Sequence, residues 1–410
     1  MKQKINEIIQ QAELNAQKLF NEIDNDIALF NQNKVLDAFR KNRVSLRHFA
    51  PTTGYGYDDI GRDTLAKVFS DVFCAENAIV SPNILSGTHA LTIALFGLLR
   101  PNDLMISITG APYDTLNEVI SGKNIGSLAE YGIKYDQVEL TSDGKLDFDE
   151  ISCVLSDKQP KLVFITRSKG YAWRDALSIN DIKNACELIK KVSPNSIIMV
   201  DNCYGEFTDK KEPLEVGADV IVGSLIKNVG GGIAPTGGYI AGKNDCIEQV
   251  GYRLTSPSIG TEVGSYNSSY LPFYEGLFFA PTVVASAVKG SILAGFAFKS
   301  LGYEVNPEPE TRPGDIIRSI KFNTAEELIS FVQGVQYSSP VDSNVTPEPW
   351  EMPGYQHKVI MAAGTFVQGA SLELSADSPI KEPYIAYLQG GLTYQHCKIA
   401  IAECLERILK

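Results

Sequence analysis

The chain has 410 residues, 44% of them hydrophobic and 21% charged, which is the balance of an ordinary globular protein and not of a disordered or membrane-embedded one. Its formal net charge of −12 argues against nucleic-acid or anionic-membrane partners, which need clustered lysine and arginine. A small solute is therefore the expected partner. The length fits one large domain with a smaller companion.

The first residues mix acids and bases without the apolar core of a signal peptide. No uninterrupted run of 18 apolar residues follows, so we expect a cytoplasmic protein. The seven cysteines are odd in number, widely spread and free of CxxC pairs, which indicates reduced, mostly buried thiols and not a disulfide framework or a zinc site. The four histidines have no ligand spacing, and no metal site is expected.

Residues 2–42 carry apolar side chains at helical spacing among polar ones, without proline or glycine, and this pattern predicts an amphipathic helix. We assign residues 1–50 to an N-terminal arm. Its apolar stripe must pack against something, and either a partner subunit or the rest of the same chain can supply that surface.

A loop rich in glycine and tyrosine follows, and it contains Tyr55, Tyr57 and Asp59 before a helix from about residue 62 to residue 74. After a short strand at 78–80, Ser86-Gly87-Thr88 opens an apolar helix that runs to residue 99. Unpaired N–H groups at such a helix start form a natural phosphate cradle, although a simple helix cap is the commoner role of this pattern. His89 is either a buried, hydrogen-bonded histidine or a contact to a bound ring.

Short apolar strands then alternate with helices, and this alternation predicts a mainly parallel sheet wrapped by helices on both faces. The expected strands are 104–108, 162–165, 197–200, 218–222 and 236–241, and a helix at 179–191 is capped by Ser178. A long helical stretch from 273 to 300, which we expect to be broken at Pro281, closes a large α/β domain of residues 51–300.

Beyond residue 302 a proline-rich segment breaks all periodicity, so we place a smaller α+β domain at residues 301–410. Its expected elements are strands at 316–322, 359–361 and 371–374, a helix at 325–333 and a closing helix from about residue 393. The loop 337–355 is long enough for a role over a site, or its Trp350 anchors it.

Two ionisable residues follow buried strands of the large domain. The strand 197–200 ends at Asp201, and the strand 218–222 leads through Ser224 to Lys227, which is followed by Asn-Val-Gly-Gly-Gly. In open α/β sheets ligands bind at such strand ends. An acid and a lysine held there suit pyridoxal phosphate, because the lysine forms a Schiff base and the acid keeps the pyridine nitrogen protonated. Taken singly, the aspartate is more often a cap or turn former and the lysine a surface residue.

Val200-Asp201-Asn202 and Ser224-Leu-Ile-Lys227 resemble the aspartate strand and the Ser-x-x-Lys motif of fold-type I pyridoxal-phosphate enzymes of cysteine and methionine metabolism. Four further motifs resemble the methionine gamma-lyase-like branch, whose members are often described as aluminium-resistance proteins. They are Thr53-Gly-Tyr-Gly-Tyr-Asp-Asp-Ile-Gly-Arg-Asp63, Ser86-Gly-Thr-His-Ala90, Ala234-Pro-Thr-Gly-Gly-Tyr-Ile-Ala-Gly242 and Tyr387-Leu-Gln-Gly-Gly-Leu-Thr-Tyr394. The resemblance implies the aspartate aminotransferase fold of the PLP-dependent transferases.

The resemblance also implies roles for the site residues. Lys227 anchors the cofactor and takes the Cα proton, with its pKa lowered by burial and a cationic neighbour. Asp201 pairs with the pyridinium, Tyr113 stacks on the ring and assists the leaving group, and the phosphate contacts are Ser86, Gly87, Thr88 and Ser224. Without the resemblance, Tyr113 reads as an ordinary half-buried turn tyrosine.

In the resembling family a tyrosine of the glycine-rich loop reaches the phosphate of the neighbouring subunit. Tyr57 aligns with it and Tyr55 is the second choice, while Asp59 replaces the family's neighbouring arginine. The second phosphate hydroxyl before the lysine is replaced by Ile226, and Cys203 is a small filler near the site and not a nucleophile. The substrate carboxylate needs a cation, and the candidates are Arg167, Arg174, Arg312 and Lys381.

We therefore expect a carbon–sulfur lyase that performs β- or γ-elimination on a sulfur amino acid of the cystathionine or methionine type. The resemblance implies a homo-oligomer whose sites are shared within a dimer, and a homotetramer built as a dimer of dimers. The alternatives are an aminotransferase or another amino-acid enzyme of the same fold, since these reactions begin with the same proton removal, and a non-catalytic protein of metal tolerance on this fold.

Overall fold

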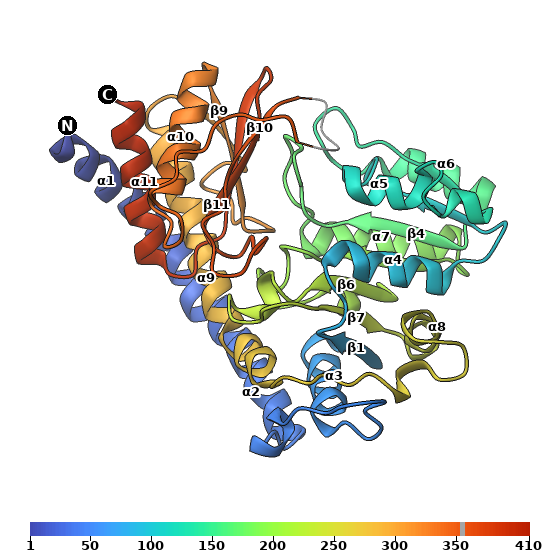
Figure 1. Cartoon of the computed structure of the whole chain (residues 1–410). Helices are drawn as coiled ribbons and strands as arrows, with labels where there is room; N and C mark the ends of the chain where they lie inside the picture. The colour runs from blue at the N-terminus through green and yellow to red at the C-terminus, as the bar shows by residue number, and fades with distance from the viewer. Residues whose placement is uncertain (353–356) are drawn as a thin grey trace.

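A computed structural model of the chain describes residues 1–352 and 357–410 and contains two β-sheets (Figure 1). The large sheet has the order β1-β7-β6-β5-β4-β2-β3, and the small one the order β10-β11-β12-β9-β8. The strands of the large sheet are β1 (Asn77–Ser81), β2 (Leu104–Ser107), β3 (Lys134–Gln137), β4 (Leu162–Thr166), β5 (Ile197–Asp201), β6 (Val220–Ser224) and β7 (Gly238–Gly242). Those of the small sheet are β8 (Glu304–Asn306), β9 (Ile317–Phe322), β10 (Val359–Ala362), β11 (Ser375–Pro379) and β12 (Tyr384–Gln389).

The helices are α1 (Lys2–Glu22), α2 (Leu29–Lys41), α3 (Ile60–Phe73), α4 (Gly87–Leu98), α5 (Asp114–Ser121), α6 (Phe148–Lys158), α7 (Ile179–Val192), α8 (Asn244–Leu254), α9 (Leu271–Lys299), α10 (Ala325–Tyr337) and α11 (Tyr394–Ile408). Helices α4, α5 and α8 share one apolar cluster on one face of the large sheet, and α3, α6 and α7 share another on the opposite face. Both faces of the large sheet are therefore covered.

The large sheet is parallel from β6 through β5, β4 and β2 to β3, and β7 runs antiparallel to both of its neighbours, β1 and β6. The small sheet is antiparallel throughout. Residues of β4 and β5 are buried on both faces, which explains their nearly continuous apolar sequences. The prediction of a mainly parallel sheet wrapped by helices, with a smaller α+β unit after it, is confirmed.

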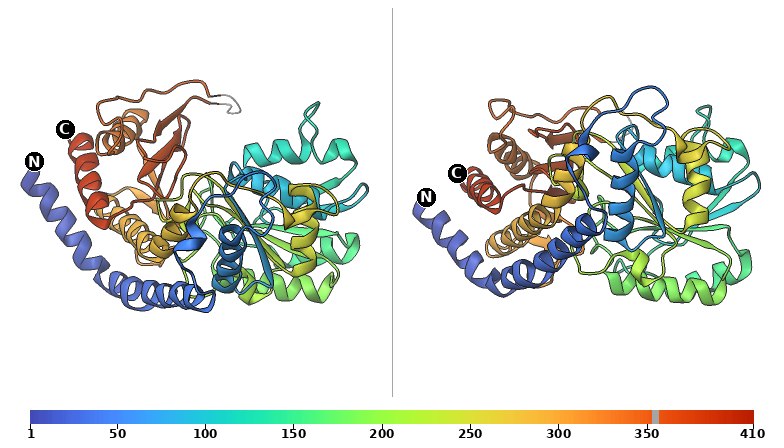
Figure 2. Two further views of the ribbon diagram at one scale, coloured as in Figure 1. Left: turned by 60° about the horizontal axis from the view of Figure 1, so that its bottom comes forward. Right: turned by 90° about the horizontal axis from the view of Figure 1, so that it is seen from below.

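The N-terminal arm is helical from residue 2 to residue 41, with a π-helical segment at Ile23–Ala28 between α1 and α2. It curves along the outside of α9 and α11, as the two views of Figure 2 show. The Tyr394 hydroxyl donates to Glu13 Oε1 at 2.7 Å, and Lys289 lies 2.7 Å from Asp24. The arm thus packs against its own chain, which was one of the two predicted possibilities.

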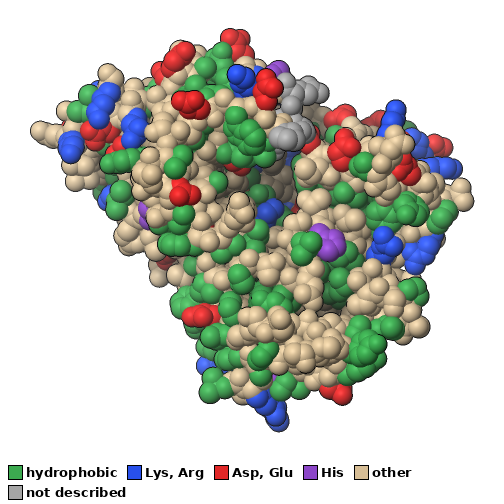
Figure 3. All heavy atoms as spheres, in the orientation of Figure 1, with side chains coloured by type: hydrophobic (Ala, Val, Ile, Leu, Met, Phe, Trp, Pro, Cys, Tyr) green, Lys and Arg blue, Asp and Glu red, His purple; other side chains and the backbone are tan. Residues whose placement is uncertain are grey.

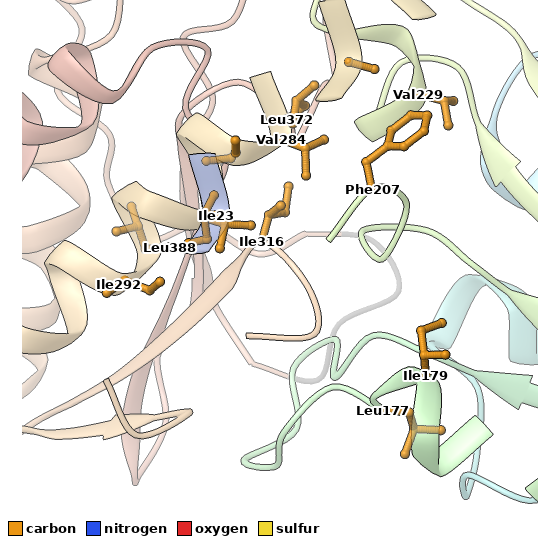
Figure 4. Close-up of a cluster of buried hydrophobic side chains, with 14 of the residues drawn as sticks. Ile23, Leu177, Ile179, Phe207, Val229, Val284, Ile292, Ile316, Leu372 and Leu388 are labelled. Atoms are coloured by element: carbon orange, nitrogen blue, oxygen red, sulfur yellow. The ribbon is translucent and has the colours of Figure 1, made fainter. Parts of the chain in front are cut away.

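One apolar core joins the arm, α9 and the small sheet. Figure 4 shows Ile23 of the arm close to Val284 and Ile292 of α9 and to Leu388 of β12, all of which belong to one cluster of buried residues. This shared core fixes the position of the small sheet relative to the large one.

Two predicted features were wrong. Helix α9 runs without a break through Pro281. A proline inside a helix costs about 3 kcal/mol, and the burial of α9 along most of its length outweighs that cost. By length and composition alone α9 is apolar enough to cross a membrane, but 67% of its most apolar window is buried, as in the core helix of a globular protein.

The segment 371–374 is not a strand, because Glu373 folds back and accepts hydrogen bonds from the backbone N–H groups of Phe366 and Val367 at 2.8 and 2.9 Å. The strand is the next segment, β11, whose neighbours β10 and β12 decide its pairing. Five elements have no counterpart among the strands and helices expected from the sequence: β3, β8, β12, α6 and α8. Part of the predicted loop 337–355, its residues 353–355, lies outside the described residues, and Trp350 is 50% exposed and forms a bridge with Val359.

Candidate functional site

The candidate site lies at the carboxyl ends of β5 and β6. Asp201 is the last residue of β5 and Ser224 the last of β6, and Asp201 pairs in parallel with Val222. Lys227 follows three residues after Ser224. Because parallel strands end at one edge of a sheet, the register brings the aspartate, the serine and the lysine together. In Figure 3 the surface is hollowed where the small sheet's part of the chain faces the part that carries α4 and α5.

Lys227 is half-buried, and its Nζ lies 4.2 Å from the centroid of the Tyr204 ring. Burial alone would lower the pKa of this amine, but nearby acidic groups, among them the Asp201 carboxylate, outweigh burial and raise its pKa well above the ordinary value. This direction is opposite to the predicted lowering by burial and a cationic neighbour, because the Asp201 carboxylate favours the charged form of the amine.

The Asp201 carboxylate is 5% exposed, and its Oδ1 accepts a hydrogen bond from the backbone N–H of Cys203 at 3.1 Å. Burial raises the pKa of this carboxyl group, while Lys227 and the Cys203 hydrogen bond oppose the rise. A buried carboxylate with one backbone donor has acceptor capacity left for a further charged donor.

The start of α4 closes the site on its other side. A Cβ on Gly87 would lie 3.4 Å from Ser224 Cβ, 3.6 Å from Cys203 Sγ and 4.0 Å from Lys227 Nζ. Ser86 caps the helix by accepting the backbone N–H of His89 at 3.1 Å. The first turn of α4, with its unpaired N–H groups, thus meets the ends of β5 and β6 and the lysine. This arrangement fits an anionic group held beside an amine.

Tyr113 is the N-terminal cap residue of α5, and its hydroxyl lies 3.0 Å from Thr88 Oγ1. Its side chain is 39% exposed. Burial and then the Asp201 charge raise the pKa of Tyr113 well above the ordinary value, and the Thr88 hydrogen bond and Lys227 only partly oppose this. In this structure the hydroxyl therefore keeps its proton at neutral pH, as a proton donor must.

His89 has a structural partner. Its Nδ1 accepts the backbone N–H of Leu85 at 3.1 Å, and burial lowers its pKa. A ring nitrogen that accepts this bond is unprotonated, so His89 is a neutral histidine in the turn that leads into α4.

Tyr55 and Tyr57 lie outside this cluster. Their side chains are 71% and 61% exposed, and their rings lie 5.6 Å apart. Arg62 holds their loop by donating to the Gly56 carbonyl at 2.9 Å. Asp59, the residue that departs from the family pattern, caps α3 and accepts the Tyr270 hydroxyl at 2.8 Å, so its role in this chain is structural.

The three arginine candidates for a carboxylate have protein partners. Arg167 is 1% exposed and donates to Asn202 Oδ1 at 2.7 Å, with Glu212 at 3.4 Å. Arg174 donates to the Ser168 carbonyl at 2.6 Å, and Arg312 forms an ion pair with Asp209 at 2.6 Å. Lys381 is exposed in the turn between β11 and β12.

Ile226 and Cys203 both lie near Lys227, and neither supplies a polar side chain to the site. The backbone N–H of Ile226 donates to Ser224 Oγ at 3.4 Å, while its side chain offers no hydroxyl. Cys203 is 5% exposed, and burial and then Asp201 raise the pKa of its thiol well above the ordinary value. A protonated, buried thiol is inert, as expected of a filler.

The sequence analysis missed Tyr204. Its ring lies next to Lys227 Nζ, and its hydroxyl accepts a hydrogen bond from Ser371 Oγ at 3.1 Å. Tyr204 has a φ of 70°, which is uncommon for a tyrosine and turns the chain back after Asp201. Its closeness to Asp201 in the sequence was the available signal. Two hollows elsewhere on the surface, near Trp173 and near Arg312, are not lined by Lys227 or Asp201.

Comparisons with known proteins agree with this geometry. The family model described as methionine gamma-lyase matches residues 5–409. The uncharacterized protein YnbB of Bacillus subtilis is 50% identical over 388 residues, which are 94% of this chain and 92% of that protein. The crystal structure of a carbon-sulfur lyase involved in aluminum resistance from Clostridium novyi is 51% identical, with a TM-score of 0.95 over 99% of this chain and 96% of that one.

A more distant structure shows the fold alone. The pyridoxal-5'-phosphate dependent protein YhfS of Escherichia coli is 16% identical, with a TM-score of 0.63 over 92% of this chain and 96% of that one. The fold is thus that of the fold-type I enzymes. The family match implies pyridoxal 5'-phosphate as the cofactor. The chain belongs to the methionine gamma-lyase family.

Proposed function

We propose that the protein is a pyridoxal-phosphate-dependent carbon–sulfur lyase that acts on a sulfur amino acid of the cystathionine or methionine type. The observation that carries this proposal is the convergence of Lys227, Asp201 and the start of α4 at one edge of the large sheet. The family match and the name of the Clostridium novyi protein support it.

The residues present fit the cofactor. The first turn of α4, with Ser86, Gly87 and Thr88, and the hydroxyl of Ser224 suit its phosphate, and a larger residue at Gly87 would fill the space between them. The buried Asp201 carboxylate suits the protonated ring nitrogen. When bound, the ring supplies an electron sink for the charge that develops at the substrate Cα.

In this proposal Lys227 is the point of covalent attachment and the base that takes the Cα proton. A base must be unprotonated, yet the acidic groups around the amine favour its charged form. If Asp201 paired with a positive ring nitrogen, its negative charge would be neutralised and would no longer raise the pKa of Lys227. Tyr113, whose hydroxyl keeps its proton, would stack on the ring and protonate the leaving sulfur; its position beside Thr88 in the first turn of α4 supports this role.

The covalent role is tested by reduction with borohydride and mass mapping of the labelled peptide. We expect a yellow protein with the label on Lys227, and no label in Lys227→Ala. Lys183→Ala is the control, because Lys183 is an exposed lysine 3.6 Å from Glu187 on the surface of α7. A label on any other lysine of the wild-type protein would refute the assignment.

The reaction class is tested with cystathionine, methionine, homocysteine and cysteine. We expect a thiol or sulfide together with ammonia and a keto acid from at least one of them. A fully loaded enzyme that releases none of these products but transfers an amino group to a keto acid would instead be an aminotransferase.

We also propose that the active unit is at least a dimer, assembled in the cytoplasm into a homotetramer, and that the exposed Tyr57, or else Tyr55, reaches the phosphate of a neighbouring subunit. Inactive Tyr57→Ala and Lys227→Ala proteins are mixed and allowed to exchange subunits. Because a mixed dimer contains one intact site, activity should return to a fraction of the wild-type value. Demonstrated exchange without recovery would exclude a shared site.

A further inference from the structure

One face of the small sheet carries polar side chains toward the candidate site. Asp377 on β11 pairs with Tyr387 on β12, and Gln389 lies two residues further on the same face. Tyr387 belongs to a small apolar cluster with Ile317 and Ile385, against which Tyr204 packs. Tyr204 is the residue whose ring lies 4.2 Å from Lys227 Nζ, so this sheet face meets the site through Tyr204.

The loop after β4 joins the same face. The ring of Tyr171 lies 5.0 Å from the ring of Tyr387, and the Tyr171 carbonyl accepts the Tyr387 hydroxyl. The Ser371 hydroxyl, from the segment before β11, donates to Tyr204. Tyr171 from the loop after β4 and Tyr387 from the small sheet therefore form one wall of the hollow between the sheets. Asp377, which pairs with Tyr387, belongs to this wall.

Asp377 has neutral partners only. Its Oδ2 accepts the Gln389 amide at 3.0 Å, and the Tyr171 side chain supplies a second hydrogen bond. No ion pair involves Asp377 in the described parts of the chain. Burial raises its pKa to about 6, so the carboxylate is still mostly ionised at neutral pH. An ionised carboxylate that is partly buried without a cation is costly, and a cationic ligand group would offset that cost.

One polar side chain on this face, other than Asp377, has no hydrogen-bond partner in the described parts of the chain. Ser375 lies two residues before Asp377 on β11, is 5% exposed, and its Oγ has no hydrogen-bond partner in the described structure. The residue Asp377 itself is only partly covered, so a ligand in the hollow can reach it. The wall thus offers the negative charge of Asp377 to a group that brings hydrogen-bond donors, next to a buried hydroxyl without a partner.

We propose that Asp377 binds a second, positively charged amino group at the distal end of the substrate. This inference rests on the proposed lyase function, and it names the substrate class as a thioether with an amino group on each side of the sulfur, such as cystathionine. A simple S-alkyl amino acid has nothing to place against this carboxylate.

The test compares cystathionine with S-(3-carboxypropyl)cysteine, which is the same thioether without the distal amino group. We expect the wild-type protein to prefer cystathionine in kcat/KM by roughly 10- to 100-fold, the range of a lost hydrogen bond to a buried charge. Asp377→Asn keeps the shape and the neutral partners, and should abolish this preference by acting on cystathionine alone. Glu382→Gln removes an exposed carboxylate from the adjoining turn and is the matched control, which should leave the preference unchanged.

Two further measurements separate this role from a structural one. The preference should fall below pH 6, where Asp377 takes up a proton, while the rate with S-(3-carboxypropyl)cysteine should not follow that change. Equilibrium binding to Lys227→Ala, with cofactor added, should show the same preference without turnover. Equal binding of the two thioethers, or equal losses for both in Asp377→Asn, would overturn the assignment of Asp377. If neither thioether is cleaved, the lyase proposal fails, and the binding measurement still decides the role of Asp377.

Discussion

The two sheets hold their polar groups in different places. The strands β4 and β5 of the large sheet are buried, and the chemically active side chains come at or just beyond strand ends, as Asp201 and Lys227 do. In the small sheet Asp377 lies in the middle of β11, on the face that it shares with Tyr387 of β12. Groups at strand ends are positioned by the backbone, whereas groups within strands depend on register and cross-strand partners. The large sheet therefore suits chemistry common to many substrates, and the small sheet suits discrimination between them.

The strongest test of the large sheet's role is Tyr113→Phe. The substitution keeps the ring at the N-terminus of α5 but removes the hydroxyl that lies 3.0 Å from Thr88. If that hydroxyl is the general acid, turnover should fall by roughly two to four powers of ten. The visible spectrum of the bound cofactor should stay as in the wild type, and an unchanged turnover would exclude Tyr113 as the acid.

The buried ion pair behind the large sheet's edge should contribute most to stability. Glu212 and Arg167 are both buried, with 3.4 Å between their charged atoms. Glu212→Gln keeps the shape but leaves the arginine charge uncompensated, so the free energy of unfolding should fall by about 3–5 kcal/mol in urea titration. Glu187→Gln, in an exposed pair on α7, should change it by less than about 0.5 kcal/mol. Similar effects at the two positions would contradict this distinction.

A pH-dependent difference is expected at Glu206, which is buried and accepts the Tyr239 hydroxyl at 2.8 Å. Burial raises its pKa to about 8 from the ordinary 4.5. The folded chain therefore keeps a proton between these two pH values that the unfolded chain loses. The contribution of Glu206 to the free energy of unfolding is therefore complete below pH 4.5. It is lost as the pH rises toward 8, by at most about 1.4 kcal/mol per pH unit.

Glu206→Gln removes that titration. Urea unfolding at pH 6, 7 and 8 should show the variant gaining about 1–3 kcal/mol relative to the wild type across the series. Glu187→Gln again serves as the control, since its carboxylate is exposed. A difference between variant and wild type that does not change with pH would mean that Glu206 is not protonated in the native protein.

The smallest effect is expected where the small sheet touches the site. Ser371→Ala removes one hydroxyl group, and with it the hydrogen bond to the Tyr204 hydroxyl. We expect a loss of about 0.5–1.5 kcal/mol in the free energy of unfolding, with full retention of cofactor. Ser286→Ala, which removes only a bond within α9, is the control. Loss of the cofactor in Ser371→Ala would show that the small sheet also supports the common chemistry.

The large sheet was predictable except for its polar edge strand β3, because its other strands are short and mostly apolar. The positions of Asp201, Ser224 and Lys227 followed from where those runs end, and the cap at Ser178 followed from a local pattern that the structure reproduces. Such signals lie within a few neighbouring residues. The roles of the site residues stay predictions, since only bound cofactor or substrate can test them.

The small sheet was less predictable because its strands are chosen by their partners. Ser371–Leu374 alternates as a strand does, yet Glu373 turns the chain there, and the polar segment Ser375–Pro379 becomes β11 between two neighbours. The contacts of Tyr204 with Lys227 and Ser371 likewise join distant parts of the chain. No local pattern encodes such contacts.

The docking of the arm has a consequence for biosynthesis. Glu13 in α1 bonds Tyr394 at the start of α11, and these residues are 381 positions apart in the chain. At 5–20 residues per second, the ribosome makes the second partner roughly 20–80 s after the first. During that time the apolar stripe with Ile5, Ile9 and Phe20 has no α11 to cover it. The arm is therefore incompletely covered, and open to chaperones, until α11 has been made.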